Sequence, residues 1–216
     1  MKNRILQSSR NKLKILIILL IFGLYSSSQV LYSQALYSIS NNKDVNMKLS
    51  GTSTLHNWNM NSKSIVGEAN FEFAGDNLSE LKDLSSLKVI LPTSSLKSKE
   101  KQMDKNVYGA LKADKYKDIV FKITSANVQP KQNNRYQLKT VGNLTIAGVT
   151  RQVNLDVFCQ INEDQTITCS GTEKLKMTDY QVTPPTFLLG AMKTGDEVTL
   201  DFTVVFKKSN LSSINH

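Results

Sequence analysis

Apolar residues recur at every second position through most of the chain, with polar residues between them. Near the C-terminus, Val198, Leu200, Phe202, Val204 and Phe206 follow this spacing. A two-residue period places the apolar side chains on one face of an extended strand. Because a sheet must bury its apolar face, the pattern predicts strands that enclose a common interior.

The same alternation predicts a mostly β protein. The expected strands cover residues 45–52, 64–73, 87–91, 118–124, 135–141, 144–158, 166–177 and 198–206. Gly142 and Gly148 are interpreted as bulges or bends. About eight strands with a single helix indicate an all-β fold, namely a closed antiparallel eight-stranded barrel.

One segment has a different period. Between Ser98 and Leu111 the apolar residues Met103, Val107 and Leu111 stand four apart, with Tyr108 beside the last of them. This spacing predicts an amphipathic helix that packs over one open end of the barrel. The helix is either a lid over a ligand entrance or ordinary packing. As part of a lid, Tyr108 would bury its ring and offer its hydroxyl to the polar head of a ligand.

The N-terminal segment resembles a targeting signal. Basic residues from Lys2 to Lys14 precede an apolar run over residues 15–25, which is too short to span a membrane. We interpret it as a signal peptide cleaved after Ala35, with a site near Ser28 as the alternative and a retained membrane anchor as the competing interpretation. The expected organisation is a signal peptide at 1–35, a barrel domain at 36–208 and a disordered tail at 209–216.

Removal of this segment changes the charge. Residues 1–35 hold 5 of the 27 basic residues and none of the 18 acidic ones, so the mature chain has 22 basic and 18 acidic residues and a formal charge of +4. This modest excess does not indicate a nucleic-acid-binding protein, because no basic stripe interleaved with aromatic residues accompanies it. It is compatible with peripheral contact to anionic lipid.

The sequence offers little for catalysis or metal binding. There is no nucleophile elbow, phosphate loop or histidine-rich metal signature, and the scattered acidic residues are interpreted as solvated charges. One histidine within the domain and two cysteines form no cluster with ligand spacing. We therefore expect no enzyme activity, no metal and no cofactor.

The two cysteines share the parity of their apolar neighbours Val157 and Ile167. A three-residue turn at residues 163–165 would place Cys159 and Cys169 opposite each other in a hairpin, where a disulfide fits the geometry and an oxidising compartment permits it. The alternative is a pair of buried free thiols.

One stretch resembles a known family. Residues 144–155, L-T-I-A-G-V-T-R-Q-V-N-L, are similar to the "L-T-I-x-G-V-T-x-x-V-x-L" signature of the YceI family. Further similarity lies at Leu111 with residues 116–121, at residues 177–180 and 195–198, and at G-T-S-T-L-H-N-W over residues 51–58. Lys117 departs from the proline that is usual in the family. The resemblance covers roughly residues 45–207.

This resemblance implies an extended, lipocalin-like barrel in the periplasm or outside the cell, with a long isoprenoid or fatty chain in its interior and a homodimer as one assembly. A tube lined by apolar side chains suits such a ligand, since each buried methylene contributes about 0.8 kcal/mol. The candidate ligand-binding residues are Phe71, Phe73, Leu91, Met103, Tyr108, Leu111, Phe121, Ile123, Leu155, Val157, Phe202 and Val204. The nine strand residues among them are also compatible with ordinary barrel core, and the three helix residues with simple packing of the helix.

His56 and Trp58 are the candidates for the barrel mouth, and a structural pair is the alternative for them. The favoured function is a non-enzymatic protein that sequesters or carries an isoprenoid or other lipid. The alternative is a structural or interaction domain with a filled core. An outer-membrane barrel would need apolar residues facing outward along every strand, whereas here charged residues alternate with one apolar set.

Overall fold

The structure is a computed structural model that describes residues 32–39, 42–75, 78, 80–187 and 192–209. Most of the expected signal peptide, at residues 1–31, and all of the expected tail except Ser209 lie outside the described residues. The strands and helices below therefore belong to a single unit that begins at Tyr32.

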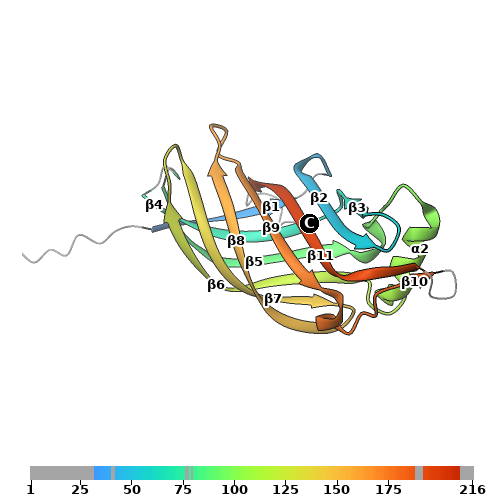
Figure 1. Cartoon of the computed structure of the whole chain (residues 1–216). Coiled ribbons are helices and arrows are strands. Elements are labelled where there is room, and N and C mark those ends of the chain that lie inside the picture. Colours follow the sequence, from blue (N-terminus) through green and yellow to red (C-terminus); the bar gives the residue numbers. More distant parts are fainter. Residues whose placement is uncertain (1–31, 40–41, 76–77, 79, 188–191, 210–216) are drawn as a thin grey trace, which may run out of the picture. The chain divides into compact units, whose positions relative to one another are not determined.

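Strands dominate the described chain (Figure 1). The strands are Tyr32–Ile39 (β1), Val45–Ser53 (β2), Trp58–Ser62 (β3), Val66–Ala74 (β4), Glu80–Pro92 (β5), Asp118–Pro130 (β6), Arg135–Ile146 (β7), Val149–Ile161 (β8), Ile167–Lys176 (β9), Thr186–Phe187 (β10) and Met192–Lys208 (β11). The α-helix α2 covers Lys101–Ala110, and 3-10 turns cover Asn42–Asp44 (η1), Thr93–Ser95 (η2) and Met177–Tyr180 (η3).

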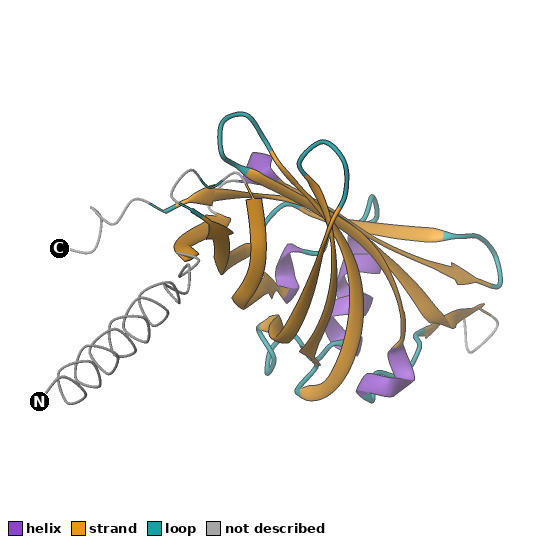
Figure 2. Cartoon of the chain, turned by 90° about the vertical axis from the view of Figure 1, so that its left-hand side faces the viewer, coloured by secondary structure: helices purple, strands orange, loops and turns teal. Residues whose placement is uncertain are grey.

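Eight of these strands close into an antiparallel ring. The order is β1-β4-β5-β6-β7-β8-β9-β11, and β1 pairs back onto β11. Closure is short, because only Tyr37 and Ser38 pair with Lys208 and Lys207. Figure 2 views the unit from the end opposite α2 and shows the strands wrapping around the interior. The predicted all-β, eight-stranded fold is thus confirmed.

Two strands extend the wall near α2. β2 pairs with β11 from Thr194 to Val204, and β3 pairs with β2. Asn61 of β3 then bridges to Lys97, just before the helix. At this end β2 and β3 complete the wall between β11 and the segment that leads into α2.

The first strand differs from the sequence interpretation. β1 begins at Tyr32, and its residues pair with β4 from Ala74 to Gly67. Ala35 is buried in the core. A domain boundary after Ala35 divides this paired strand, whereas the alternative cleavage near Ser28 leaves it whole. Ser209, which we assigned to the tail, donates its backbone N–H to the Leu36 carbonyl at 2.8 Å.

A strand over residues 144–158 was the wrong interpretation. The chain reverses at Ala147 and Gly148, which have positive φ angles of 48° and 82°, and Ile146 pairs with Val149 across the turn. Two successive positive φ values give the turn that matches the twist of a two-residue hairpin. Gly148 also lies so close to the Tyr116 ring that a Cβ atom there would overlap it.

The end of the barrel opposite α2 is filled by aromatic side chains. The ring of Phe71 makes edge-to-face contacts with Tyr37 and Phe206, with centroid distances of 5.4 and 5.6 Å. The Phe73 ring also packs against Tyr37, with a centroid distance of 6.2 Å. The Tyr37 hydroxyl donates to the carbonyl of Gln165 at 3.2 Å, so this aromatic plug is fastened to the β8–β9 turn.

Candidate ligand tunnel

The interior is hollow at the α2 end. A cavity of about 320 Å³ lies between α2, β2, β11 and η3, within the size range of small-molecule sites. Most of its lining is apolar, including Met103, Val107 and Leu111 of the helix. Exposed residues such as His56 and Glu100 also line it, so the cavity reaches the surface. We call it the mouth cavity.

A second cavity of about 150 Å³ lies deeper, toward the aromatic plug. It is bordered by residues of β2, β4–β9 and β11. Six side chains border both cavities, namely Met47, Leu91, Ile119, Leu144, Leu175 and Leu200. The mouth cavity and this deep cavity therefore lie next to each other and share part of their wall, and the deep cavity extends to Phe71. We call the two cavities together the tunnel.

Most of the candidate ligand-binding residues lie on this tunnel. The tunnel wall includes Phe71, Leu91, Met103, Leu111, Phe121, Leu155, Val157, Phe202 and Val204. Three candidates lie elsewhere. Phe73 is fully buried beside Tyr37, Ile123 packs against the core without bordering either cavity, and Tyr108 faces the segment before α2.

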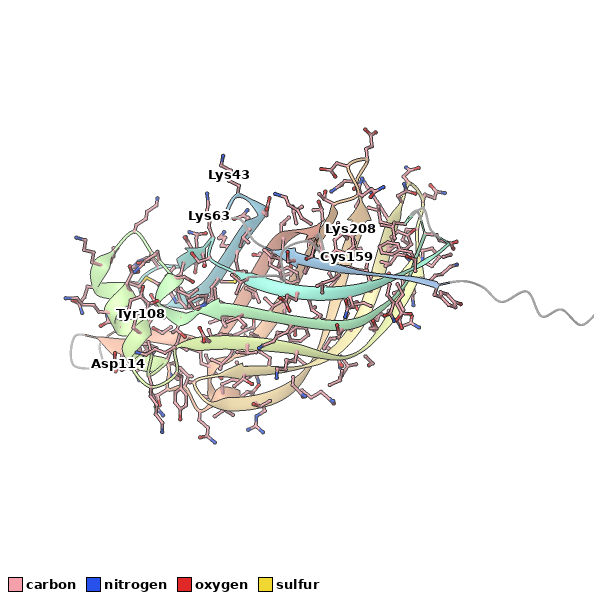
Figure 3. All side chains as sticks on the ribbon, turned by 180° about the vertical axis from the view of Figure 1, so that it is seen from behind. Lys43, Lys63, Tyr108, Asp114, Cys159 and Lys208 are labelled. Carbon is pink, nitrogen blue, oxygen red and sulfur yellow. A yellow bond between two sulfur atoms is a disulfide. The ribbon has the colours of Figure 1, made fainter. Side chains whose placement is uncertain are left out.

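Tyr108 has a structural contact in place of the expected ligand contact. Its hydroxyl lies 2.7 Å from the Leu96 carbonyl and 2.9 Å from the Ser94 carbonyl, and it accepts a hydrogen bond from the Lys97 ammonium group at 2.7 Å. Figure 3 shows Tyr108 at the α2 end of the barrel and Cys159 toward the opposite end. The hydroxyl thus fastens the helix to the loop after β5 and is already paired.

The start of α2 is fixed by a buried carboxylate. Asp104 is 8% exposed, and it accepts hydrogen bonds from the backbone N–H and the hydroxyl of Ser98, both at 2.7 Å. Burial by itself would raise the pKa of Asp104, but the two bonds from Ser98 and the charge of Lys97 outweigh it and lower the pKa. The ionised carboxylate therefore holds the helix over the mouth cavity.

His56 and Trp58 both border the mouth cavity. His56 lies in the loop before β3 rather than on a strand, so the two side chains do not share a strand face. The Trp58 indole donates to the Thr52 carbonyl at 3.1 Å and covers Gly51, where a Cβ atom would overlap the ring. Their placement agrees with the proposed mouth, while contact with a ligand stays a prediction.

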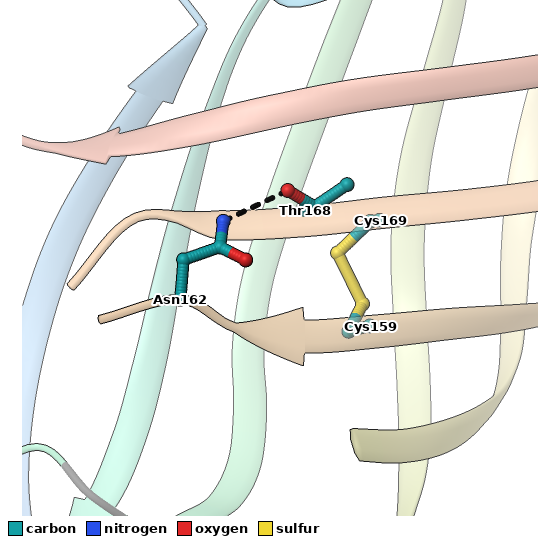
Figure 4. Close-up of a disulfide and its surroundings, with 4 residues drawn as sticks. All are labelled: Cys159, Asn162, Thr168 and Cys169. Atoms are coloured by element: carbon teal, nitrogen blue, oxygen red, sulfur yellow. Dashed lines mark hydrogen bonds between the residues drawn. A yellow bond between two sulfur atoms is a disulfide. The ribbon is translucent and has the colours of Figure 1, made fainter. Parts of the chain in front are cut away.

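Cys159 and Cys169 lie opposite each other in the β8–β9 hairpin and form a disulfide (Figure 4). Their Cα atoms are 4.2 Å apart. Both are buried and border the deep cavity. The turn beyond them is closed by Asn162, whose side-chain amide donates to Thr168 at 2.9 Å.

Two polar residues that border the cavities were not among the candidates predicted from the sequence. Glu173 borders the deep cavity, although all the acidic residues were interpreted as solvated. Glu173 stands an even number of residues from Cys169 and Leu175 on β9 and therefore shares their inward face. This spacing is the signal in the sequence that could have identified it. Tyr180, in η3, borders the mouth cavity and is 3% exposed. Burial raises the pKa of Tyr180 to about 12. The charges of Asp179 and Glu173 add smaller increases, and the charge of Arg151 opposes them.

Within the described ranges, no group of three or more histidine, cysteine or acidic side chains is arranged to hold a metal ion. No helix in this part of the chain has the length and apolar character needed to cross a membrane.

Comparison with known proteins identifies the family. The model of the YceI-like domain matches residues 39–206, which span the barrel from the end of β1 to β11. The chain belongs to the YceI-like family. The comparison with curated proteins found no match.

Two solved structures share the fold. BcnA from Burkholderia cenocepacia is 18% identical, with a TM-score of 0.58 over 76% of this chain and 98% of its own. A polyisoprenoid-binding domain from Saccharophagus degradans, implicated in plant cell wall breakdown, is 9% identical, with a TM-score of 0.62 over 80% of this chain and 98% of its own. At these identities the likeness is one of fold.

Proposed function

We propose that this YceI-like protein is a non-enzymatic binding protein that holds a long-chain isoprenoid or another lipid in its barrel. The main support is the pair of adjacent, mostly apolar cavities between the surface at α2 and Phe71. Burying a hydrocarbon chain there removes apolar surface from water, at about 0.8 kcal/mol per methylene. The ligand named for the similar Saccharophagus degradans domain adds support for an isoprenoid.

Export to the periplasm or the medium belongs to the same proposal. The basic and apolar N-terminal segment favours a signal peptide, and the pairing of Tyr32–Ala35 with β4 favours cleavage near Ser28. Disulfides such as Cys159–Cys169 form and persist in oxidising compartments of this kind. Mass spectrometry of the mature protein would give its N-terminus, and a start at residue 36 would contradict cleavage near Ser28.

The surface around the mouth supports contact with a membrane that supplies the lipid. Residues 97–117 contain seven lysines and three acidic residues. All seven lysines are exposed, while Asp104 is buried. A basic rim of this kind is attracted to anionic lipid headgroups. Co-sedimentation with vesicles containing anionic lipid, compared with neutral vesicles, would test this contact.

Ligand binding can be measured directly. Trp58 is the only tryptophan of the chain and borders the mouth cavity, so its fluorescence should change when geranylgeraniol enters. Leu200→Phe adds bulk where the two cavities meet and should weaken binding by about tenfold or more. Thr203→Phe adds the same ring at an exposed position of β11 and serves as the control. Equal affinity of both variants, or no binding by the native protein, would refute the tunnel.

A further inference from the structure

The deep cavity contains one charged group in an otherwise mostly apolar wall. Glu173 lies on β9 opposite Leu200 of β11 and has the inward parity of its neighbour Leu175. Another polar side chain in the lining, Thr140, donates its hydroxyl to the Leu155 carbonyl at 3.0 Å. A carboxylate in an apolar cavity is costly unless it gains a partner.

The neighbouring strand supplies no such partner. β8 and β9 pair only as far as Val157 and Gly171, so Glu173 lies beyond the point where their ladder ends. The nearby charged group on β8 is the Asp156 carboxylate, which has the same sign as Glu173. Burial first, and then Asp156, raise the pKa of Glu173. No ion pair joins Glu173 to any residue that the structure describes.

A second polar group in the tunnel also lacks a partner. The Tyr180 hydroxyl is buried and makes no hydrogen bond with the described part of the chain. Tyr180 packs in one cluster with Leu144 and Leu175, which are two of the six side chains that border both cavities. Glu173 borders the deep cavity and Tyr180 the mouth cavity, so the two polar residues lie on either side of the wall that Leu144 and Leu175 contribute to both.

We propose that Glu173 and Tyr180 form a polar subsite in the tunnel, which binds a hydroxyl group of the ligand and excludes a carboxylate. This inference rests on the proposed function. A hydroxyl can donate to the Glu173 carboxylate and can also accept from the Tyr180 hydroxyl, so an alcohol offers the hydrogen-bonding group that each of the two residues lacks. A carboxylate at the same place meets a like charge. The ligand class is therefore a long-chain alcohol or hydroxylated isoprenoid rather than a fatty acid.

Three probes with the same chain separate these effects. Hexadecan-1-ol both donates and accepts, methyl hexadecanoate only accepts, and hexadecanoate carries a charge. At about pH 8, where a free carboxyl is ionised, the native protein should bind the alcohol most tightly and hexadecanoate about tenfold more weakly. Trp58 fluorescence gives each dissociation constant, and native mass spectrometry confirms one bound chain.

Two variants assign the selectivity to the subsite. Glu173→Gln removes the charge and should strengthen hexadecanoate binding by about tenfold, so that its affinity approaches that of the alcohol. Tyr180→Phe should weaken the alcohol and the ester by about threefold to tenfold and leave the carboxylate unchanged. Glu197→Gln is the control, because it removes an exposed carboxylate that pairs with Lys174 at 3.0 Å.

The outcomes separate this inference from the function on which it rests. Equal binding of all three probes by the native protein, or an unchanged ranking in Glu173→Gln, would overturn the polar subsite and leave the lipid-binding function standing. A lack of binding by any probe would overturn both. The same gain for hexadecanoate in Glu197→Gln would assign the effect to overall charge and would also overturn the subsite.

Discussion

The two ends of the barrel have the same alternating pattern and opposite interiors. At one end the rings of Tyr37, Phe71, Phe73 and Phe206 pack against one another and close off the deep cavity, which Phe71 and Phe206 border. At the α2 end the inward side chains border a cavity. Inward apolar residues therefore either fill a barrel or line it, and the alternation by itself does not distinguish the two.

The difference comes from how the wall is completed. Near the aromatic plug, β1 closes directly on β11 and places Tyr37 in the centre. Near α2, the wall passes through β2 and β3 before it reaches Lys97. More strands enclose a wider interior, and leucine and methionine side chains do not span it. The helix then covers the opening.

The largest expected effect separates a filling side chain from a lining one. Phe73→Ala should destabilise the protein by about 3–5 kcal/mol, because a fully buried ring leaves a cavity among close-packed neighbours. Phe121→Ala, at the border of the deep cavity, should cost roughly half as much. Urea denaturation of both variants measures the free energies of unfolding. Equal losses would contradict the division into a solid and a hollow end.

The disulfide should contribute the next largest effect. Cys159→Ala/Cys169→Ala removes a crosslink over a sequence separation of 10 and should cost about 2–3 kcal/mol in the chain-entropy model. The substitution should affect lipid affinity less than stability, because the two cysteines border the deep cavity and not the mouth cavity. Reducing agent should lower the stability of the native protein and leave the variant unchanged. Sensitivity of the variant to the reducing agent would indicate another cause.

At the hollow end, Asp104 should matter less. Asp104→Ala leaves the Ser98 donors without their acceptor and should cost about 1–2 kcal/mol. Because the folded pKa is lowered, this contribution is present above the pKa of the unfolded state and is lost as the pH falls through the folded value. Thermal melts across acidic pH should therefore converge for native protein and variant. Asp114→Ala, at an exposed position, is the control.

The smallest effect has the opposite sign. The pKa of Glu173 is raised, so the folded state loses stability as the pH rises from the unfolded value of about 4.3 through the folded one. Glu173→Gln should therefore stabilise the protein at neutral pH, by less than about 1 kcal/mol since the carboxylate is partly solvated. At a pH below the range in which Glu173 titrates, the native protein and Glu173→Gln should have the same melting temperature. A stabilisation that persists there would exclude the charge as its cause.

Local sequence determined most of the elements. The four-residue spacing of Met103, Val107 and Leu111 corresponds to α2, and the parity of Cys159 and Cys169 corresponds to their opposed positions in the hairpin. The prediction failed at Ala147–Gly148, because a glycine between two β-like segments is compatible with a bulge as well as with a turn. It also missed β1, since the small residues before Ala35 satisfy a cleavage motif as readily as a strand.

The sequence by itself determined a barrel with one apolar surface, because the period of side chains along a strand is fixed by backbone geometry. Only the tertiary structure decided which apolar residues meet across the interior and which face a tunnel. That outcome depends on wall length and strand closure, which are set by pairings between distant residues such as Tyr37 and Lys208. It also brought Glu173 and Tyr180, which lie on different elements, to two cavities that share Leu144 and Leu175 in their walls.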